Sequence, residues 1–289
     1  MKTLLVFGGT GQLGSAISSA AQHDWKIATP SSVQVDLRDG EAVRQQILHA
    51  RPGAIINAAA YTRVDDAEVD RETAFLVNAA APAAMAAAAT ALGVPFLHVS
   101  TDYVFDGTGQ QPYQIDAHTN PLNVYGESKR AGEISVRSAC PDAAIVRTAW
   151  VHAGRGVNFI ATAVRLLTAG TSMRVVDDQV GTPTRAAHLA DALLHLLTRE
   201  TVAGMYHYTD AGVASWYDVA CCVHEALATA GRLPEGVTVT PVESSAYPRP
   251  ARRPAISVLS THASRNAAGW SQPYWRHGVV TSVQELLHA

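Results

Sequence analysis

The chain has 289 residues, of which 47% are hydrophobic, and a formal net charge of −3 at pH 7. This length allows one large domain or two of moderate size, with enough apolar residues for a core. The small net charge excludes a strong field for nucleic acid or an anionic membrane, so we expect neither partner. The three cysteines, Cys140, Cys221 and Cys222, form no disulfide framework, which favours reduced thiols in a cytoplasmic protein.

The N-terminal segment has the order strand, glycine-rich turn, helix. Apolar residues at 4–7 precede Gly8, Gly11 and Gly14, and helix-compatible residues follow at 15–22. Four apolar residues are too few for the core of a secretory signal peptide. Glycine lets a pyrophosphate approach the backbone, and the N-terminus of the following helix favours an anion. The segment therefore predicts a dinucleotide-binding turn in a βαβ unit.

Short strands and helices keep alternating through the first half of the chain. We expect strands at 25–29, 54–57, 94–100 and 143–147, and helices at 38–50, 71–91 and 125–137. Residues 79–92 are alanine-rich, contain Pro82 and are too few to span a membrane, so we interpret them as a buried helix. Repeated strand–helix units predict a parallel sheet with helices on both faces, which binds ligands at the carboxyl ends of its strands.

The second half of the chain is less regular. Three further helices are expected at 159–168, 185–197 and 216–230. The predicted fold is α/β, with a Rossmann-type doubly wound parallel sheet at 1–150 that also recruits helices from about 176–204. A smaller substrate-binding domain would come mainly from 151–289 and interleave with the first.

Tyr125 and Lys129 stand four residues apart on a predicted helix and therefore share one face of it. A phenol near an ammonium has its anion favoured, so we expect a lowered Tyr125 pKa. Such a tyrosine exchanges protons with a carbonyl or an alcohol near neutral pH. The pair alone is also typical of an ordinary helix face, but the serine, threonine and aspartate at 100–102, at the end of a predicted strand, favour a catalytic interpretation.

Several longer motifs cover almost the whole chain in one order. They are G-Q-L-G at 11–14, V-D-L at 35–37, N-A-A-A-Y-T-R-V-D at 57–65, S-T-D-Y-V-F-D-G at 100–107, the segment 121–129, R-T-A-W at 147–150, N-F at 158–159, D-Q-V-G-T-P-T at 178–184 and R-P-A-I-S-V-L-S at 253–260. In these motifs the chain resembles the extended short-chain dehydrogenase/reductases and, within them, the dTDP-4-dehydrorhamnose reductase family.

The resemblance implies that Thr101, Tyr125 and Lys129 are a catalytic trio. Tyr125 would donate a proton to a ketone oxygen as hydride arrives from a nicotinamide. Lys129 would lower the tyrosine pKa and hold the nicotinamide ribose. Thr101 would donate a hydrogen bond to the developing alkoxide.

The resemblance also implies a set of binding residues. Those expected to contact the cofactor, besides Tyr125 and Lys129, are Gly8, Gly11, Gln12, Leu13, Asp36, Leu37, Ala60, Tyr61 and Thr62. Thr101, Asp102 and Trp150 would contact the sugar nucleotide, with core packing beside the sheet as the alternative for Trp150.

Three departures from the family pattern bear on binding. Residues 29–32 (T-P-S-S) contain neither an acid nor an arginine, which favours NADPH and leaves NADH possible. Arg63 and Asp66 stand where the family pattern has a small residue and a lysine, which changes the charge beside the cofactor. Some members bind magnesium at a dimer contact through acidic residues, but Ser15 is not acidic. We therefore expect no metal, and a monomer or a homodimer.

The segment 247–254 carries Arg249, Arg252 and Arg253 among three prolines. Arginines on a stiff loop can grip a nucleotide pyrophosphate bidentately. We therefore expect Arg252 and Arg253 to contact the substrate, with a solvated basic loop as the alternative.

The implied activity is NADPH-dependent reduction of the 4-keto group of dTDP-4-dehydrorhamnose to give dTDP-L-rhamnose. Two other functions remain open. One is reduction of another dTDP-4-keto-6-deoxysugar, as in antibiotic sugar biosynthesis. The other is a non-catalytic regulatory subunit built on the same fold.

Overall fold

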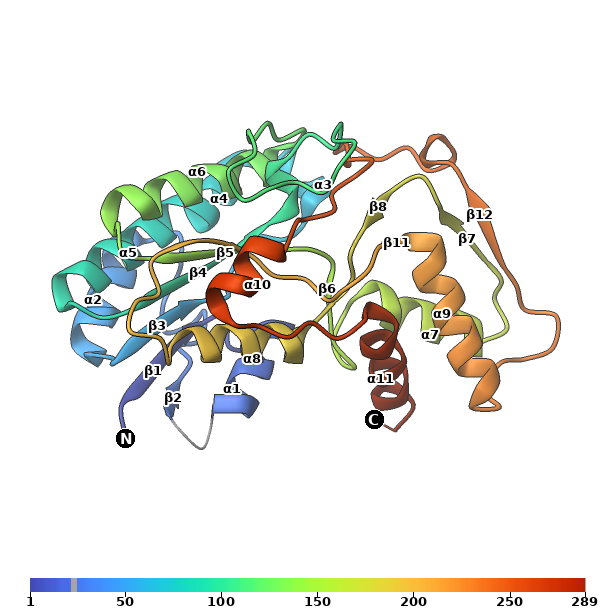
Figure 1. Cartoon of the computed structure of the whole chain (residues 1–289), viewed down its shortest axis with the longest axis horizontal. Coiled ribbons are helices and arrows are strands. Elements are labelled where there is room, and N and C mark those ends of the chain that lie inside the picture. The colour runs from blue at the N-terminus through green and yellow to red at the C-terminus, as the bar shows by residue number, and fades with distance from the viewer. Residues whose placement is uncertain (22–24, 289) are drawn as a thin grey trace.

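A six-stranded sheet organises the larger lobe of the molecule (Figure 1). The structure is a computed structural model that describes residues 1–21 and 25–288. Neighbouring strands all run parallel, in the order β10-β5-β4-β3-β1-β2. The strands are β1 (Thr3–Phe7), β2 (Lys26–Ala28), β3 (Ala54–Asn57), β4 (Phe96–Thr101), β5 (Ala144–Thr148) and β10 (Gly204–His207).

Both faces of this sheet are covered by helices, because each strand presents apolar side chains to both sides. In β1, Leu4 and Val6 pack toward one face, and Leu5 and Phe7 pack toward the other. The first face is covered by α1 (Gln12–Ala21) and α8 (Ala186–Leu196). The second is covered by α2 (Gly40–Ala50), α5 (Ala81–Leu92) and α6 (Val124–Ala139). The predicted Rossmann-type α/β fold is therefore confirmed.

The predicted helix at 71–91 is interrupted shortly before Pro82. A short helix α4 (Arg71–Phe75) leads into a π-helical turn at Leu76–Ala80, and α5 follows. Pro82 has no N–H, and its ring clashes with the carbonyl four residues earlier in a regular helix. The carbonyl four residues before Pro82 belongs to Asn78, which lies within the π-turn. The Asn78 carbonyl instead lies against α6, where an added Cβ at Gly132 would be 2.1 Å from it.

The continuous helical stretch Arg71–Leu92 has 22 residues and contains an 18-residue window with a mean hydropathy of 1.6, which by length and composition alone would allow it to cross a membrane. This helical stretch is longer than the alanine-rich segment 79–92, which alone has too few residues to span a membrane. In the structure α5 packs against both α2 and α6, so its apolar residues form the core beneath the sheet.

The smaller lobe is built from the second half of the chain (Figure 1). Three helices form its core: α7 (Phe159–Thr168), α9 (Trp216–Thr229) and α11 (Trp275–His288). Ser215 caps α9 in a capping box with Asp218. Two parallel strands, β7 (Met173–Val176) and β12 (Val239–Val242), lie beside these helices.

The chain crosses between the lobes more than once. Helix α8 packs on α1, β10 adds the edge strand beside β5, and α10 (His262–Ala268) packs on β10. Short strand pairs connect the lobes: β6 (Val151–His152) with β9 (Thr184–Arg185), and β8 (Val180–Gly181) with β11 (Ala214–Ser215). We propose a division near residue 150, with the later segments that join the sheet counted in the first domain.

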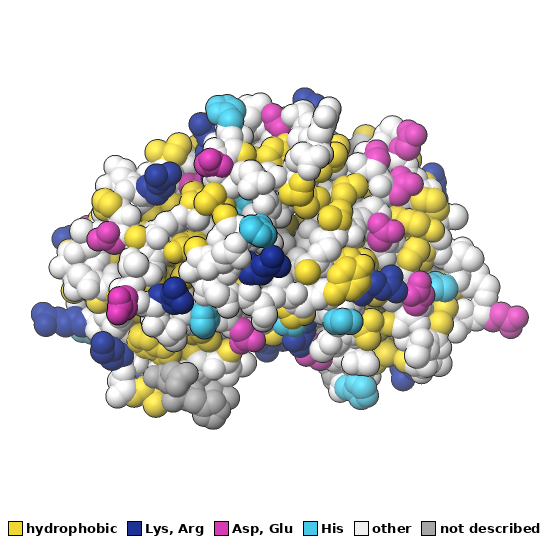
Figure 2. All heavy atoms as spheres, viewed as in Figure 1, with side chains coloured by type: hydrophobic (Ala, Val, Ile, Leu, Met, Phe, Trp, Pro, Cys, Tyr) yellow, Lys and Arg dark blue, Asp and Glu magenta, His cyan; other side chains and the backbone are white. Residues whose placement is uncertain are grey.

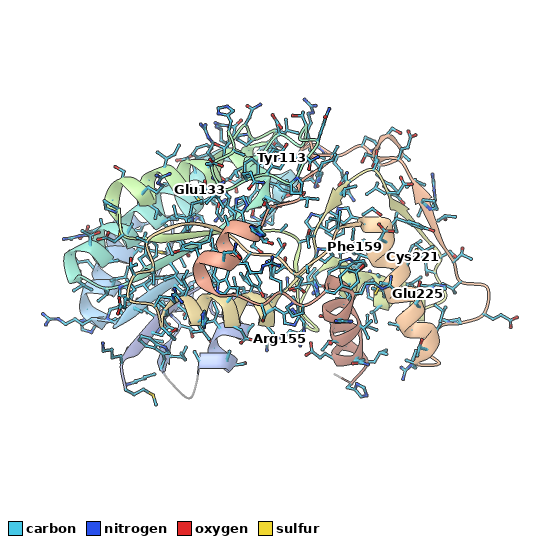
Figure 3. All side chains as sticks on the ribbon, viewed as in Figure 1. Tyr113, Glu133, Arg155, Phe159, Cys221 and Glu225 are labelled. Atoms are coloured by element: carbon cyan, nitrogen blue, oxygen red, sulfur yellow. The ribbon has the colours of Figure 1, made fainter. Side chains whose placement is uncertain are left out.

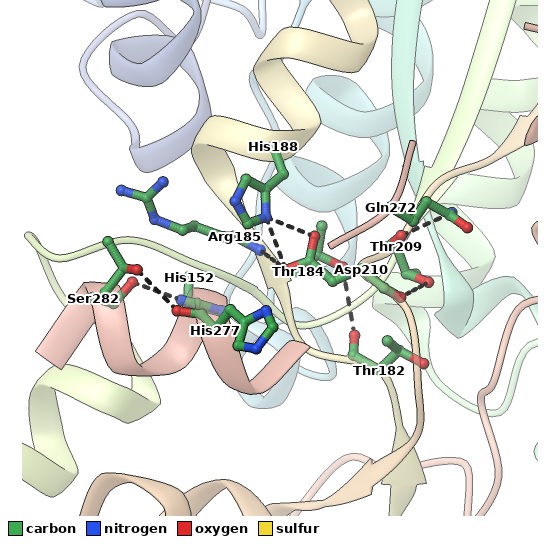
Figure 4. A network of polar contacts seen from close by, with 11 residues as sticks. His152, Thr182, Thr184, Arg185, His188, Thr209, Asp210, Gln272, His277 and Ser282 are labelled. Atoms are coloured by element: carbon green, nitrogen blue, oxygen red, sulfur yellow. Dashed lines mark hydrogen bonds and ion pairs between the residues drawn. The ribbon is translucent and has the colours of Figure 1, made fainter. Parts of the chain in front are cut away.

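A polar network stiffens the junction between the lobes (Figure 4). His188 Nδ1 on α8 lies 3.0 Å from both carboxylate oxygens of the buried Asp210. His152 Nδ1 on β6 lies 3.0 Å from the hydroxyl of Ser282 on α11. Burial lowers the pKa of His152 to about 3, so this ring is neutral. These contacts tie α8 to the loop that follows β10, and α11 to β6.

The face of the molecule in Figure 2 carries acidic and basic side chains interspersed, without a patch of one sign. This distribution agrees with the small net charge of the chain. This face gives no indication of a steering field for a highly charged macromolecule.

We expect the contact between Gly132 and Asn78 to be essential for packing of α6. Gly132→Ala places a methyl group 2.1 Å from the Asn78 carbonyl oxygen, so α6 must shift. The variant should lose about 1–3 kcal/mol in the free energy of unfolding, measured by urea denaturation. Gly40→Ala is the control, because its Cβ would lie 3.6 Å from Ala84 in ordinary contact. Equal stability of the two variants would contradict this interpretation.

Candidate active site

A cavity of about 650 Å³ opens at the carboxyl ends of β1, β3, β4 and β5. Strand order reverses beside β1, since β2 lies on one side of it and β3 on the other. Such a switch point is where open α/β sheets bind ligands. The predicted site residues that line the cavity are Gly8, Gly11, Gln12, Leu13, Leu37, Ala60, Thr62, Thr101, Tyr125, Lys129 and Trp150.

The glycine turn is held close to the end of β3. Gly8 has a φ of 81°, and an added Cβ there would lie 2.7 Å from the Ala59 nitrogen. At Gly14 an added Cβ would lie 2.1 Å from the Gly8 carbonyl oxygen. Only glycine fits at either position, so the turn is tight and brings the start of α1 to the cavity wall. A phosphate can approach this backbone, where the helix dipole favours an anion.

The predicted catalytic trio converges on the same cavity. Thr101 ends β4, Tyr125 stands in the first turn of α6, and Lys129 follows one turn later. Asn123 caps α6 by accepting a 2.8 Å hydrogen bond from the Gly126 amide, which fixes where the helix begins. The sequence therefore brings all three residues to one place through the strand end and the helix start.

The protonation of Tyr125 differs from the sequence-based expectation. Burial raises the Tyr125 pKa to about 12, with a contribution in the same direction from the Asp102 charge, while a hydrogen bond with Thr101 lowers it. The expectation of a lowered pKa was therefore wrong. It relied on the charge of Lys129, but the Lys129 ammonium donates to the Val99 carbonyl at 2.7 Å. The phenol is protonated at neutral pH, as a proton donor must be.

Asp102 lies behind Thr101 and is absent from the cavity lining. Its Oδ1 accepts a 3.0 Å hydrogen bond from the Thr101 hydroxyl, and its side chain is buried. Burial raises the Asp102 pKa to about 6, opposed by hydrogen bonds from Ser257 and Thr101. The structure thus assigns Asp102 an orienting contact with Thr101, and the expected contact with a sugar nucleotide stays a prediction.

Two other expected cofactor residues also turn away from the cavity. Asp36 binds Arg38 through both carboxylate oxygens at the surface, and only its neighbour Leu37 reaches the cavity. The Tyr61 hydroxyl donates to Asp70 at 3.1 Å, so its ring points elsewhere while Ala60 and Thr62 line the cavity. Their roles as cofactor contacts stay predictions.

Arg63 and Asp66, the two residues of the segment 57–66 that depart from the family pattern, neutralise each other's charge. Arg63 Nε lies 3.3 Å from an Asp66 carboxylate oxygen, and both side chains are exposed. The guanidinium also lies over the Tyr61 ring, 4.9 Å from its centre. The pair therefore adds no net charge beside the cavity.

Trp150 has a φ of 47°, which places a bulky residue in the left-handed region. Its ring stacks on Trp216, with centroids 3.8 Å apart and planes 8° apart. An added Cβ at Gly181 would lie 2.7 Å from the Trp150 ring, which explains the glycine in the D-Q-V-G-T-P-T motif. The strained Trp150 is held at the cavity wall by these neighbours.

A second cavity of about 580 Å³ adjoins this aromatic stack on the side of the smaller lobe. Trp216 and Phe159 line it, together with Arg249 and Arg253. Figure 3 labels Phe159 in the smaller lobe, where α7 and α9 meet. The cavity thus combines aromatic rings with arginines, the groups that suit a base and a pyrophosphate.

The structure places the two predicted arginines of this loop differently, and their contact with the substrate stays a prediction. Arg253 lines the second cavity and forks onto Asp65 at 2.6 and 2.8 Å. Arg252 is exposed and outside the cavity, and its carbonyl accepts a 2.7 Å hydrogen bond from Asn123. Arg249, which we did not select, lines the cavity in its place.

Residues 1–288 match the model of the RmlD substrate binding domain family. The chain belongs to this family. It is 40% identical to dTDP-4-dehydrorhamnose reductase of Burkholderia thailandensis over 294 residues, covering 98% of this chain and 99% of that protein. A crystal structure of a dTDP-4-dehydrorhamnose reductase from Clostridium acetobutylicum superposes with a TM-score of 0.92 at 34% identity, covering 99% of this chain and 100% of that one.

A second similar crystal structure contains a bound ligand. The dTDP-4-dehydrorhamnose reductase of Bacillus anthracis, in complex with NADP, superposes with a TM-score of 0.90 at 31% identity and covers 98% of this chain and 99% of that one. The family resemblance found in the sequence motifs is confirmed by these similarities. The predicted nicotinamide dinucleotide cofactor agrees with the NADP bound in the Bacillus anthracis structure.

Several residues of this RmlD-family site were missed in the sequence. Asn78 accepts a hydrogen bond from the Tyr61 amide at 2.8 Å and donates to the Ser128 hydroxyl at 2.9 Å, which joins the 60–62 segment to α6. The signal that could have identified Asn78 is that it is a lone amide side chain next to an alanine-rich segment. Trp216 opens the predicted helix at 216–230, and nothing in the neighbouring sequence indicates that its ring stacks on Trp150.

The histidines of α8 serve the fold. His188 binds Asp210, and His195 Nε2 lies 3.0 Å from the Ala268 carbonyl oxygen. Among residues 1–21 and 25–288, no group of three or more histidine, cysteine or acidic side chains is placed to hold a metal ion.

Proposed function

We propose that this protein reduces the 4-keto group of dTDP-4-dehydrorhamnose to give dTDP-L-rhamnose, with NADPH as the reductant. One observation carries the proposal: a single cavity joins the glycine turn to Thr101, Tyr125 and Lys129. The relatives of similar length named as dTDP-4-dehydrorhamnose reductases support the choice of substrate. We further propose a cytoplasmic monomer or homodimer.

The residues around the cavity fit a dinucleotide. The glycine turn leaves no side chain between the backbone and a pyrophosphate, and the start of α1 provides the anion-binding end of a helix. Thr10, Gly11, Gln12 and Leu13 would hold the phosphates, Leu37 the adenine, and Ala60 and Thr62 the next part of the cofactor. When bound, the nicotinamide supplies a hydride to the ketone carbon.

The catalytic trio supplies the proton and the electrostatic support. Tyr125 holds its proton at neutral pH and donates it from Oη to the ketone oxygen. The one hydroxyl hydrogen of Thr101 points to Asp102 in the structure, and it would turn to the ketone oxygen as charge develops there. Lys129, buried at the cavity wall, would bind the ribose of the cofactor.

The second cavity would hold the nucleotide part of the substrate. Arg249 and Arg253 offer positive charge to a pyrophosphate, and Trp216 and Phe159 offer aromatic faces to a base. Trp150 stands between the two cavities and would contact the sugar. The reacting carbonyl would then lie near Tyr125.

A single assay separates this function from the two alternatives. Purified protein is mixed with NADPH and either dTDP-4-dehydrorhamnose or other dTDP-4-keto-6-deoxysugars, and NADPH oxidation is followed. Preference for dTDP-4-dehydrorhamnose supports the proposal. Preference for another ketosugar would identify a different ketoreductase, and no oxidation with any of them would favour a non-catalytic subunit.

Tyr125→Phe tests the proton donor. The ring keeps its edge-to-face contact with Tyr103, so folding should survive. Turnover should fall by roughly 10²–10⁴-fold, the usual contribution of general acid catalysis, in a steady-state assay of NADPH oxidation. Tyr206→Phe is the matched control, because its hydroxyl binds the Ala203 carbonyl away from the cavity. Near-normal turnover in Tyr125→Phe would remove this residue from the mechanism.

Ser31→Asp tests the choice of cofactor. The backbone amide and the hydroxyl of Ser31 contact the Gln34 amide oxygen, and no carboxylate stands in the 29–32 segment. The wild type should bind NADPH at least as tightly as NADH. A carboxylate at this position accepts from ribose hydroxyls and repels a 2′-phosphate, so Ser31→Asp should shift preference toward NADH. Fluorescence titration with both cofactors measures the ratio, and Ser31→Asn is the neutral control of equal size.

Arg253→Ala tests the arginine loop. If Arg253 grips the pyrophosphate, dTDP affinity should fall by about 1.5–3 kcal/mol, or roughly ten- to a hundredfold, while NADPH affinity stays unchanged. Arg253→Lys should recover only part of the loss. Arg252→Ala is the control from the adjacent position outside the cavity. Calorimetric titration of dTDP into NADPH-loaded protein gives the result, and equal affinities in both alanine variants would assign the pyrophosphate contact elsewhere.

A further inference from the structure

A buried carboxylate lies one helical turn behind the proposed catalytic lysine. Glu133 follows Lys129 by four residues on α6, so the two side chains share a face of that helix. Lys129 is 2% exposed and Glu133 is 4% exposed. Glu133 is labelled in the larger lobe in Figure 3 and does not line the cofactor cavity. Any part it plays in the reaction must therefore act through its neighbours.

Glu133 connects α6 to the end of β4. Its Oε1 accepts a 2.6 Å hydrogen bond from the Ser100 hydroxyl, and Ser100 directly precedes Thr101. Lys129 reaches the same strand, since its Nζ donates to the Val99 carbonyl at 2.7 Å. The helix that carries Tyr125 and Lys129 is thus fastened to the strand that carries Thr101 through two consecutive residues of β4.

Arg147 completes the cluster from β5. Its guanidinium forks onto Glu133, with Nε 2.8 Å from Oε1 and Nη2 2.7 Å from Oε2. It also donates to the Ile115 carbonyl at 3.1 Å and lies over the Phe105 ring. His207 on β10 lies 3.4 Å from Arg147, and its pKa is lowered to about 3 by burial, so this ring carries no charge.

The charges around Lys129 differ in sign and effect. Burial lowers the Lys129 pKa to about 8, and the Glu133 carboxylate acts in the opposite direction. His98 on β4 is buried, which holds its pKa well below the ordinary value and leaves it neutral. Tyr125 is protonated, and the buried Asp102 lies beyond it against Thr101. Glu133 is therefore the carboxylate that favours the ammonium form of Lys129.

We propose that Glu133 is a positioning residue of this active site, which keeps Lys129 in its ammonium form and, through Ser100, holds Thr101 in register with Tyr125. The inference rests on the proposed reductase function. The competing explanation is that Glu133 only balances the buried charge of Arg147. A buried ion pair is strongly destabilised when one partner is lost, so the two explanations need separate measurements.

The chain offers a direct measurement, because its only lysines are Lys2, Lys26 and Lys129. With the lysine side chains isotope-labelled, NMR yields three ε-methylene signals, and Lys129→Arg identifies one of them. The titration of Lys129 is then followed in the folded protein without substrate. Lys2 and Lys26 are exposed and report any general effect of pH.

Glu133→Gln should shift the Lys129 titration to lower pH by about one to three units, because the opposite charge that favoured the ammonium is gone. The alkaline limb of the kcat profile should move the same way, and a one-unit shift lowers kcat about tenfold above that limb. Glu127→Gln is the matched control on the same helix. Its carboxylate pairs at the surface with Arg71 at 2.8 Å, and both the titration and kcat should stay unchanged.

A double variant, Glu133→Gln with Arg147→Met, guards against misfolding. It removes both buried charges, so the melting temperature should recover relative to Glu133→Gln alone. The proposal requires that Lys129 still titrates at lower pH in this variant. A return of the titration and of the kcat profile to wild-type values would show that Glu133 only neutralises Arg147 and would overturn the proposal.

The same measurements separate this inference from the proposed function. A wild type that oxidises no NADPH with dTDP-4-ketosugars would contradict the reductase function, while a Lys129 titration that still responds to Glu133→Gln would support the coupling. An unchanged Lys129 titration in an active enzyme would contradict the coupling alone.

Discussion

Backbone contact between α6 and its neighbours is the constraint on which the site depends. An added Cβ at Gly126 would lie 2.2 Å from the Tyr103 carbonyl oxygen, and one at Gly132 would lie 2.1 Å from that of Asn78. Backbone atoms cannot adjust as side chains can, so two such contacts fix the height and rotation of the helix. Tyr125 precedes the first contact, and Lys129 lies between the two. Their positions are thus set by main chain rather than by adaptable side-chain packing.

Local patterns in the sequence were sufficient for the first five strands of the larger lobe and for the cavity at their carboxyl ends. Alternation of apolar runs with helical segments predicts a parallel sheet, and the carboxyl ends of parallel strands meet at one edge. Gly8, Thr101 and Trp150 each stand just after a predicted strand. The order and direction of the strands were therefore enough to predict that these residues lie close together. The π-turn before Pro82 was not located from the sequence, because its position depends on the contact of Asn78 with α6.

The remaining features depend on contacts between distant segments. Strand β10 is short and pairs with β5 far away in the chain, so periodicity gives little sign of it. Arg252 and Arg253 are adjacent, and sequence alone does not reveal which of two neighbouring side chains faces a cavity. The Tyr125 pKa was predicted from a helical neighbour, whereas burial beneath several segments determines its direction. A charge pattern in the sequence shows which charged side chains are neighbours along a helix. It does not show how far each side chain is removed from water, and that burial sets the direction of the pKa shift here.

Desolvation also explains how one site can hold groups with opposite protonation needs. Burial favours the neutral form of every titratable group, which keeps a proton on Tyr125 and would remove one from Lys129. A proton donor benefits from this environment, but an ammonium does not. The lysine therefore needs a partner charge that leaves the tyrosine protonated. Glu133 meets this requirement because it lies on the far side of Lys129 from Tyr125 along α6, where its field acts on the lysine more strongly than on the phenol.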